Sequence, residues 1–348
     1  MIAKYCKYIL RFKQPAGTSR GVLTEKETYF IKVYEPSTPE VFGIGECALF
    51  RGLSADDVPD YEQRLAALCQ AISRDEQSDL TQFPSMLFGL ETAVYDLSSG
   101  GRRTPFPSAF TDGQGEIPIN GLVWMGSRDE MLARIDDKLK AGFTTIKIKV
   151  GAIDFESELD LLRHIRKVFP AEAITIRLDA NGGFSPDVAL ERLDALARYD
   201  IHSIEQPIKA GQWDEMAELC LNSPIPIALD EELIGIADTA ERCRMLDTVK
   251  PQFVVLKPSL VGGFLQTQQW MMLAAQRGIG GWITSALESN IGLNAIAQWT
   301  AAMGADMPQG LGTGALFTNN FDCPLRQIGE SLCYDPTAHW QLPELDWR

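Results

Sequence analysis

The sequence predicts an α/β protein: a (β/α)8-type barrel with an N-terminal α+β capping domain. Two observations support this fold class. From about residue 115, eight short apolar segments recur at intervals of roughly 25 to 30 residues, each followed by a helical pattern or a loop, which is the rhythm of a barrel. The first hundred residues lack this rhythm and mix strand and helix patterns.

The capping domain is expected over residues 1–112. Its apolar patterns predict two strands and then two helices, at 28–35, 41–50, 60–73 and 84–99. Two glycine-rich stretches, 15–23 and 45–54, are either plain turns or loops that close over the barrel mouth and exclude water.

The barrel itself is expected over residues 113–320. Its predicted strands are 117–124, 144–150, 173–180, 201–207, 225–231, 252–259, 280–286 and 309–316. An open doubly wound sheet is the competing fold, but the first of these strands is not followed by a GxGxxG turn. The last segment, 321–348, carries no helical period and is expected to return to the capping domain.

Composition excludes several classes of partner. The chain has 348 residues and a formal net charge of −15, which repels nucleic-acid phosphates and anionic membranes. No apolar run approaches the length of a membrane span, and lysines interrupt the apolar start, which is unlike a secretory signal. Seven scattered cysteines without a CxxC motif indicate reduced thiols. We therefore expect a cytoplasmic protein that binds neither nucleic acid nor membranes, and its oligomeric state stays open.

Three consecutive predicted strands end in carboxylates. Asp179, Glu205 and Asp230 stand at these ends, and Asn181 and Glu231 follow close behind. In a barrel the carboxyl ends of the strands surround the active site. Neighbouring carboxylates repel one another unless a cation joins them, and an all-oxygen set suits a hard divalent ion. The pattern therefore predicts a Mg²⁺ site, with Mn²⁺ as a possible substitute.

Lysines occupy unusual places in two predicted strands. Lys147 and Lys149 share one face of the strand 144–150, and Lys257 ends the strand 252–259 on the other side of the mouth. Charge on an exposed edge strand is the alternative explanation, but a barrel has no edges. Two charges roughly 6.6 Å apart repel by about 2.5 kcal/mol at an effective dielectric of about 20. We therefore expect a charged Lys147 to keep Lys149 partly neutral and able to accept a proton.

The order KIK, LDAN, EQP, LDEE and LKPS on successive strands resembles the enolase superfamily, in its muconate lactonizing subgroup. The resemblance covers essentially the whole chain. It implies that Asp179, Glu205 and Asp230 bind Mg²⁺ and that Lys149 and Lys257 are the catalytic pair. In this family a proton α to a carboxylate is removed, which gives an enediolate. The expected supporting residues are Lys147, Asn181 and Glu231.

Within this subgroup the chain most resembles the o-succinylbenzoate synthase branch. The resemblance is carried by PINGLVWMG, TSALESNIGL, GLGTGALF and FKQPAGTSRGVL. It implies a Mg²⁺-dependent syn-dehydration of 2-succinyl-6-hydroxy-2,4-cyclohexadiene-1-carboxylate in menaquinone biosynthesis.

Other functions remain open at this stage. N-acylamino acid racemization and dipeptide epimerization use the same scaffold, although epimerases of the subgroup usually carry a DxD pair in the eighth strand, where this chain has GTGAL. A metal-free Schiff-base aldolase would use Lys149 or Lys257 as its nucleophile. A barrel retained only for binding predicts dispensable lysines.

Overall fold

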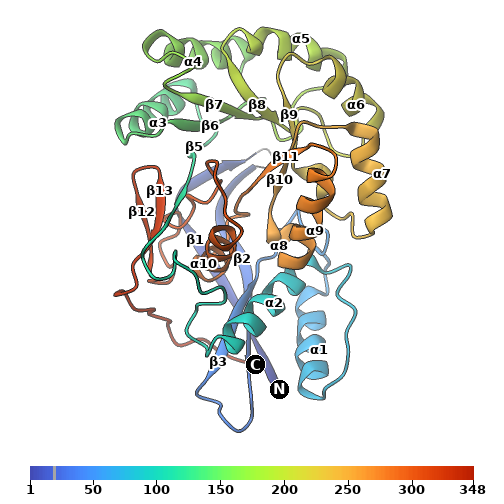
Figure 1. The fold of residues 1–348 in the computed structure, drawn as a ribbon, viewed down its shortest axis with the longest axis vertical. Coiled ribbons are helices and arrows are strands. Elements are labelled where there is room, and N and C mark those ends of the chain that lie inside the picture. The colour runs from blue at the N-terminus through green and yellow to red at the C-terminus, as the bar shows by residue number, and fades with distance from the viewer. Residues whose placement is uncertain (19–20) are drawn as a thin grey trace.

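The N-terminal part of the computed structural model is an antiparallel sheet, ordered β1-β2-β3, with two helices packed against it (Figure 1). The structure describes residues 1–18 and 21–348, so the middle of the glycine-rich stretch 15–23 lies outside the described residues. The elements are β1 (Ile2–Thr18), β2 (Gly21–Tyr34), β3 (Phe42–Cys47), α1 (Tyr61–Ser73) and α2 (Pro84–Ser98).

Helix α2 packs very close to β3 because glycines remove the side chains between them. A Cβ atom on Gly43 would lie 1.8 Å from the carbonyl oxygen of Ala93, and one on Gly45 would lie 1.9 Å from that of Gly89. Real Cβ atoms cannot approach so closely, so only glycine permits this packing. The helix therefore holds the end of β3, from which the chain continues into the pocket described below.

A curved sheet of seven parallel strands follows, in the order β11-β10-β9-β8-β7-β6-β5 (Figure 1). Its strands are β5 (Gly121–Val123), β6 (Thr145–Lys149), β7 (Thr175–Asp179), β8 (Ile201–Glu205), β9 (Ile227–Leu229), β10 (Phe253–Leu256) and β11 (Gly280–Ile283). The helices are α3 (Arg128–Lys140), α4 (Phe155–Val168), α5 (Pro186–Ala197), α6 (Trp213–Asn222), the 3-10 turn η1 (Glu231–Leu233), α7 (Thr239–Val249), α8 (Pro258–Val261), α9 (Gly263–Ala275) and α10 (Asn290–Ala302).

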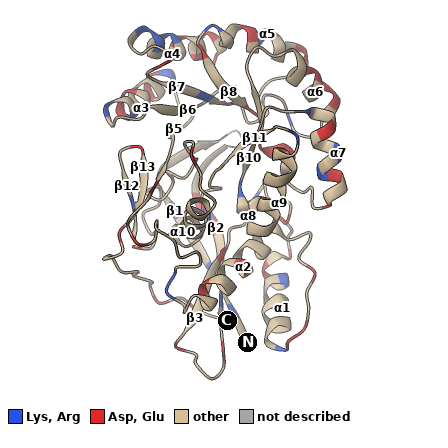
Figure 2. Ribbon diagram, viewed as in Figure 1, with Lys and Arg blue, Asp and Glu red and all other residues tan. Residues whose placement is uncertain are grey.

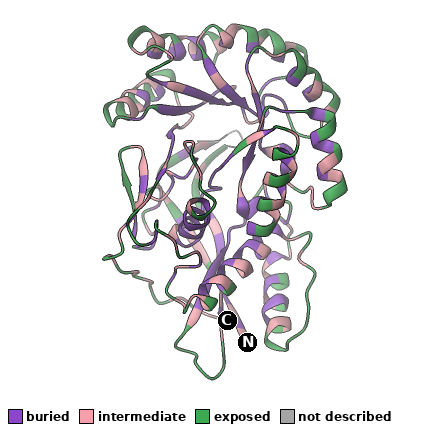
Figure 3. Cartoon of the chain, viewed as in Figure 1, coloured by how far each residue is buried: buried purple, intermediate pink, exposed green. Residues whose placement is uncertain are grey.

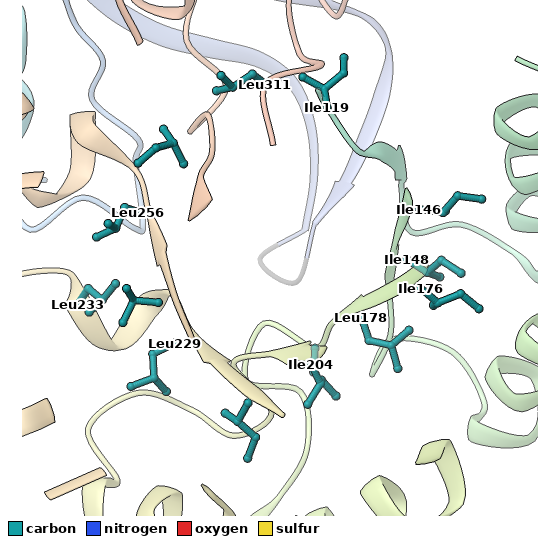
Figure 4. Close-up of a cluster of buried hydrophobic side chains, with 14 of the residues drawn as sticks. Ile119, Ile146, Ile148, Ile176, Leu178, Ile204, Leu229, Leu233, Leu256 and Leu311 are labelled. Carbon is teal, nitrogen blue, oxygen red and sulfur yellow. The ribbon is translucent and has the colours of Figure 1, made fainter. Parts of the chain in front are cut away.

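The side chains of strand β6 alternate between the two faces of the seven-stranded sheet. Ile146 and Ile148 lie on the side of β6 that faces the helices, next to Ile176 of β7 (Figure 4). Burial of each such side chain contributes about 1.5–3 kcal/mol to stability. Because successive side chains of a strand alternate, Lys147 and Lys149 are left on the inner face. The apolar packing of one face thus orients the lysines of the other.

The expected eighth strand, 309–316, is not a regular strand, and this part of the prediction is wrong. Gln309 forms a single bridge with Ile119, and Gly310 forms a single bridge with Thr284. Backbone hydrogen bonds of 2.8–3.1 Å join the segment to both edges of the seven-stranded sheet. Glycines recur along the segment, and they offer no side chains that would pack against a neighbouring strand. The regular sheet therefore has seven strands.

A second small sheet joins distant parts of the chain. It contains β4 (Glu116–Pro118), β12 (Leu325–Ile328) and β13 (Ser331–Tyr334), in the order β12-β13-β4. The expected first barrel strand, 117–124, is thus divided between β4 and β5, because Pro118 has no N–H for a ladder and ends β4. Near the end of the chain, Tyr5 and Arg348 exchange backbone hydrogen bonds of 3.2 and 2.9 Å. The segment 321–348 therefore contributes β12 and β13 to this sheet, and its end pairs with β1 of the N-terminal sheet.

Burial and charge follow this architecture. Buried residues line the strands and the inner sides of the helices, whereas exposed residues lie on the outer sides (Figure 3). Acidic and basic segments are interspersed along the outer helices from α4 to α7 (Figure 2). Among the helices of residues 1–18 and 21–348, none combines the length and the apolar character that a membrane span needs.

Candidate active site

A pocket lies at the carboxyl ends of the parallel strands. The sheet contributes Lys149, Asn181 and Lys257, which end or closely follow β6, β7 and β10. Phe50 and Leu53, from the segment after β3, also line the pocket. Polar groups from the sheet and apolar groups from the N-terminal part therefore face one cavity.

The hairpin of β1 and β2 reaches the same end of the sheet. Gly17 bridges Met125, just beyond β5. A Cβ atom on Gly17 would lie 2.9 Å from the carbonyl oxygen of Met125, so glycine permits this contact. Of the two predicted loops, 45–54 thus lines the pocket and the described part of 15–23 lies against the end of β5; their closure stays a prediction.

Lys147 also lines the pocket and is paired with two carboxylates. Its Nζ is 2.6 Å from Oε2 of Glu205 and 2.9 Å from Oδ2 of Asp179. Burial disfavours the ammonium group, but the charges of Asp179, Glu205 and Asp230 raise the pKa of Lys147 above its usual value. Lys147 is therefore charged at neutral pH. Its predicted effect on Lys149 stays a prediction.

Lys149 reaches into the pocket, where it shares Asp179 with Lys147 and has Asn181 as its second partner. Its Nζ donates to Oδ1 of Asn181 at 2.6 Å and to Oδ2 of Asp179 at 3.0 Å. Asn181 in turn donates to Oε1 of Glu231 at 3.0 Å. The backbone of Asn181 has a φ of 44°, a left-handed conformation that asparagine tolerates better than most residues. The turn after β7 therefore aims an amide oxygen at the Lys149 ammonium.

Lys257 lies across the pocket at the end of β10 and forms an ion pair with Oδ2 of Asp230. Burial disfavours its charged form, but Asp230 and Glu205 raise the pKa of Lys257. Its side chain is 13% exposed and Lys149's is 12% exposed. The two lysines thus present ammonium groups to the same cavity from different strands.

The three predicted carboxylates are buried side by side. Asp179 and Glu205 are register partners on β7 and β8, and Asp230 directly follows β9. Burial disfavours the charged form of Asp179, yet the neighbouring ammonium groups hold its pKa well below the usual range. Burial and repulsion from Asp179 raise the pKa of Glu205, and burial raises the pKa of Asp230.

These carboxylates fit a hard divalent cation in their chemistry. All their donor atoms are oxygens, and the buried Oε1 of Glu205 has no hydrogen-bond partner among the described residues. Within that part of the chain, no three ligand-type side chains converge on one point. Ammonium groups hold the carboxylates instead, since Lys147 lies between Asp179 and Glu205. The three carboxylates would therefore suit Mg²⁺ if the lysine ammonium groups moved away from them.

One supporting residue was missed by sequence reasoning. Gln206, directly after Glu205, accepts hydrogen bonds of 3.2 Å from the backbone N–H groups of Asp230 and Glu232, and donates to Oε2 of Glu232 at 3.0 Å. It thus fixes the turn that carries Asp230. The glutamine of the EQP motif was the available signal, because a polar residue at the end of a buried strand needs partners.

Two hydroxyl groups of the pocket were also missed. Ser285 and Thr313 line it, and Oγ1 of Thr313 lies 2.8 Å from Oγ of Ser285. Both stand in motifs that the sequence identifies, but small hydroxyl residues in loops carry little chemical signal by themselves.

The comparison with known protein families decides the relationship. Residues 130–321, more than half of the chain, match the family model described as "Enolase C-terminal domain-like". The chain belongs to the enolase superfamily.

Members of the enolase superfamily with similar sequences or structures include an o-succinylbenzoate synthase from Desulfotalea psychrophila, which is 47% identical over 94% of this chain and 98% of the relative. The crystal structure of MenC from D. psychrophila LSv54 matches with a TM-score of 0.86 and 43% identity, over 96% of this chain and 99% of that chain. The dipeptide epimerase from Cytophaga hutchinsonii, complexed with Mg and D-Ala-L-Val, matches in fold with a TM-score of 0.79 and 22% identity, over 99% and 98%. This member of the enolase superfamily is therefore an enzyme.

Proposed function

We propose that this enzyme is a lyase that dehydrates 2-succinyl-6-hydroxy-2,4-cyclohexadiene-1-carboxylate to 2-succinylbenzoate, a step of menaquinone biosynthesis. The observation that carries the proposal is the pair Lys149 and Lys257, which face one pocket above three buried carboxylates. The 47% identity with an o-succinylbenzoate synthase over nearly the full chain supports the choice of substrate. The proposed partner is thus a small carboxylate, and the proposed location is the cytoplasm.

We further propose a division of the chain. Residues 1–112 would form the capping domain, 113–320 the catalytic domain and 321–348 a segment that returns to the cap. The segment 309–316 would complete a (β/α)8-type barrel without regular strand pairing, because its bridges join both edges of the sheet.

Asp179, Glu205 and Asp230 are the residues that would hold Mg²⁺, or Mn²⁺ in its place. The oxygen donors and the unpartnered Oε1 of Glu205 support this assignment. When bound, the cation would supply Lewis-acid stabilisation of the negative charge that develops on the substrate carboxylate.

Lys149 is the proposed base and acid. Its neutral Nζ removes the proton α to the substrate carboxylate, which leaves an enediolate. The resulting ammonium then returns the proton to the hydroxyl group on the same face, the carbon–oxygen bond breaks, and water leaves. Asn181 accepts a hydrogen bond from Nζ and orients it, supported by Glu231.

Lys257 is proposed to stay protonated throughout. Its raised pKa and its ion pair with Asp230 support a permanent positive charge. The charge lies on the opposite side of the pocket from Lys149 and would stabilise the enediolate by electrostatic attraction. Phe50 and Leu53 line the pocket with apolar groups, which limits access of water.

An activity assay tests the proposal. The enzyme is treated with a chelator, and conversion of the hydroxycyclohexadiene substrate is followed with and without added Mg²⁺. We expect 2-succinylbenzoate to form only when Mg²⁺ is restored. Absence of product in the presence of Mg²⁺ would refute the assignment.

N-acylamino acid racemization and dipeptide epimerization are the alternatives on this scaffold. No carboxylate lies between Gly312 and Leu316 to hold the ammonium group of a dipeptide, which disfavours the epimerase. Incubation with N-acylamino acids in deuterated water, followed by measurement of α-proton exchange, separates racemization from dehydration.

A further inference from the structure

A second group of charged residues is buried between the N-terminal sheet and the part of the pocket formed by Ser285 and Ala286, called the pocket wall below. The group comprises Lys26 of β2, Glu46 of β3 and Glu288, which lies between β11 and α10. Their exposed fractions are 5%, 0% and 0%. Buried charges carry a large desolvation cost unless they are compensated, so this arrangement requires a physical reason.

Glu46 binds the start of helix α10. Its Oε2 accepts from Oγ of Ser289 at 2.6 Å and from the backbone N–H of Gly292 at 3.1 Å, and its Oε1 accepts from the N–H of Ser289 at 3.1 Å. The first N–H groups of a helix have no partners within the helix and attract negative charge. A carboxylate of the N-terminal sheet therefore anchors the helix that follows the pocket wall.

Glu288 holds the pocket wall itself. Its Oε2 accepts from Oγ of Ser285 at 2.6 Å and from the N–H of Ala286 at 2.8 Å, and its Oε1 accepts from Oγ of Ser259 at 2.5 Å. Ser285 and Ala286 both line the pocket. Any displacement of Glu288 would therefore move groups that face the ligand.

Lys26 lies on the face of β2 that is turned toward these two carboxylates. Thr28, two residues along on that face, donates to Oε1 of Glu46 at 2.8 Å. Leu10, the register partner of Lys26, belongs to the same buried cluster as Ala286 and Leu287.

The Nζ of Lys26 is buried and has no hydrogen-bond partner among the described residues. Burial lowers the pKa of Lys26, and attraction to Glu46 and Glu288 opposes this. Burial raises the pKa of Glu46, and repulsion from the charge of Glu288 adds to this effect. Positive charge on Lys26 would attract both carboxylates, without a direct hydrogen bond to either among the described residues.

We propose that Lys26 is a positioning residue, whose charge balances the repulsion between Glu46 and Glu288 and so keeps Ser285 and Ala286 in place on the pocket wall. The inference rests on the proposed function only in assuming that this pocket binds the substrate. It assigns to the N-terminal sheet an electrostatic role in shaping the site, in addition to covering it.

Two neutral variants test this role: Lys26→Met, which keeps the length of the side chain, and Lys26→Gln, which keeps a polar end. Lys26→Arg restores the charge, and Lys138→Met on α3 is the control for replacing a half-buried lysine elsewhere. Amide hydrogen exchange at Ala286 reports on the wall without any substrate. We expect exchange to be at least about tenfold faster in the neutral variants, and close to wild type in Lys26→Arg and in the control.

Steady-state kinetics adds a second readout. We expect the neutral variants to raise KM by about tenfold while kcat changes less than about threefold, because the binding wall shifts and the lysines do not. Ser285→Ala combined with Lys26→Met should be no worse than Ser285→Ala alone, since both act through one hydroxyl group.

These measurements distinguish a failure of the role of Lys26 from a failure of the proposed function. Wild-type protection of Ala286 in a folded neutral variant, or full additivity with Ser285→Ala, would overturn the role of Lys26. A wild-type enzyme without dehydration activity would refute the proposed function, and hydrogen exchange at Ala286 would still decide the role of Lys26.

Discussion

Lys147 and Lys149 contact the same oxygen atom, Oδ2 of Asp179, at 2.9 and 3.0 Å. Strand alternation places both side chains on one face of β6, and the register of β6 with β7 sets Asp179 opposite Lys149. Their other partners differ, because Lys147 turns down to Glu205 and Lys149 turns toward Asn181. Replacement of Lys147 should therefore affect stability most, and replacement of Lys149 should affect turnover.

Lys149→Ala should lower kcat by about 10³-fold or more, because one group is proposed to act as both base and acid. Mg²⁺ binding should change little, since the proposed ligands remain. Steady-state assays measure turnover, and calorimetric titration measures the cation. A variant that kept most of its activity would remove Lys149 from the mechanism.

Asp179→Asn should weaken Mg²⁺ binding by about ten- to hundredfold, because an amide oxygen replaces a charged donor. Titration calorimetry of the chelator-treated protein measures this affinity. Asp194→Asn, an exposed carboxylate on α5, is the matched control and should bind as the wild type does. Equal affinities for the two variants would contradict the assignment of Asp179 as a ligand.

Lys147→Met should lower the free energy of unfolding by about 3–5 kcal/mol, because it leaves Asp179 and Glu205 buried without their ammonium partner. Lys147 has a raised pKa, so its stabilising contribution is complete below the unfolded value of about 10.4 and declines only as the pH rises above it. Burial raises the pKa of its partner Glu205 to about 8, so Glu205 can take up a proton once the ammonium is removed, and the deficit should be smaller at pH 6 than at pH 9. Urea unfolding measures it, with Lys138→Met as the control; an unchanged midpoint would count against the ion pair.

Asp56 should make stability depend on pH. It accepts hydrogen bonds from the N–H and Oγ of Ser85, and burial raises its pKa to about 6. The folded protein thus holds a proton that the unfolded chain releases near pH 4, so the contribution of Asp56 to the free energy of unfolding should fall by roughly 3 kcal/mol as the pH rises from about 4 to about 6. Asp56→Asn does not titrate. Its stability relative to wild type should therefore rise over this window in urea titrations, and parallel pH curves would refute the effect.

The positions of the lysines and carboxylates could largely be predicted because strand geometry is local, whereas their roles stay predictions. The isoleucines of β6 alternate with Lys147 and Lys149, so their burial decides where both lysines point. Parallel pairing then places Asp179 and Glu205 side by side. Each step uses only the period of a strand and the common direction of its neighbours.

Other features depend on contacts between distant segments, which a single sequence does not reveal. Lys26 and Glu288 are far apart in the chain, and their proximity depends on how β1 and β2 pack against the segment after β11. The segment 309–316 has the spacing of a strand, yet its glycines leave too little side chain for regular pairing. The partners of Gln206 likewise depend on the turn after β9.

Between the edge strands β5 and β11, the described part of the sheet is closed only by the single bridges of Gln309 and Gly310. We expect local opening of the sheet to begin at this place. Only a few backbone hydrogen bonds must break there, and Gly310 and Thr284 both line the pocket. Ser285 and Asn120 line the pocket on the two sides of this place. A ligand that contacts both residues would therefore hold the two edges of the sheet together. Tight binding would then slow the opening of the sheet and raise the temperature at which the protein unfolds.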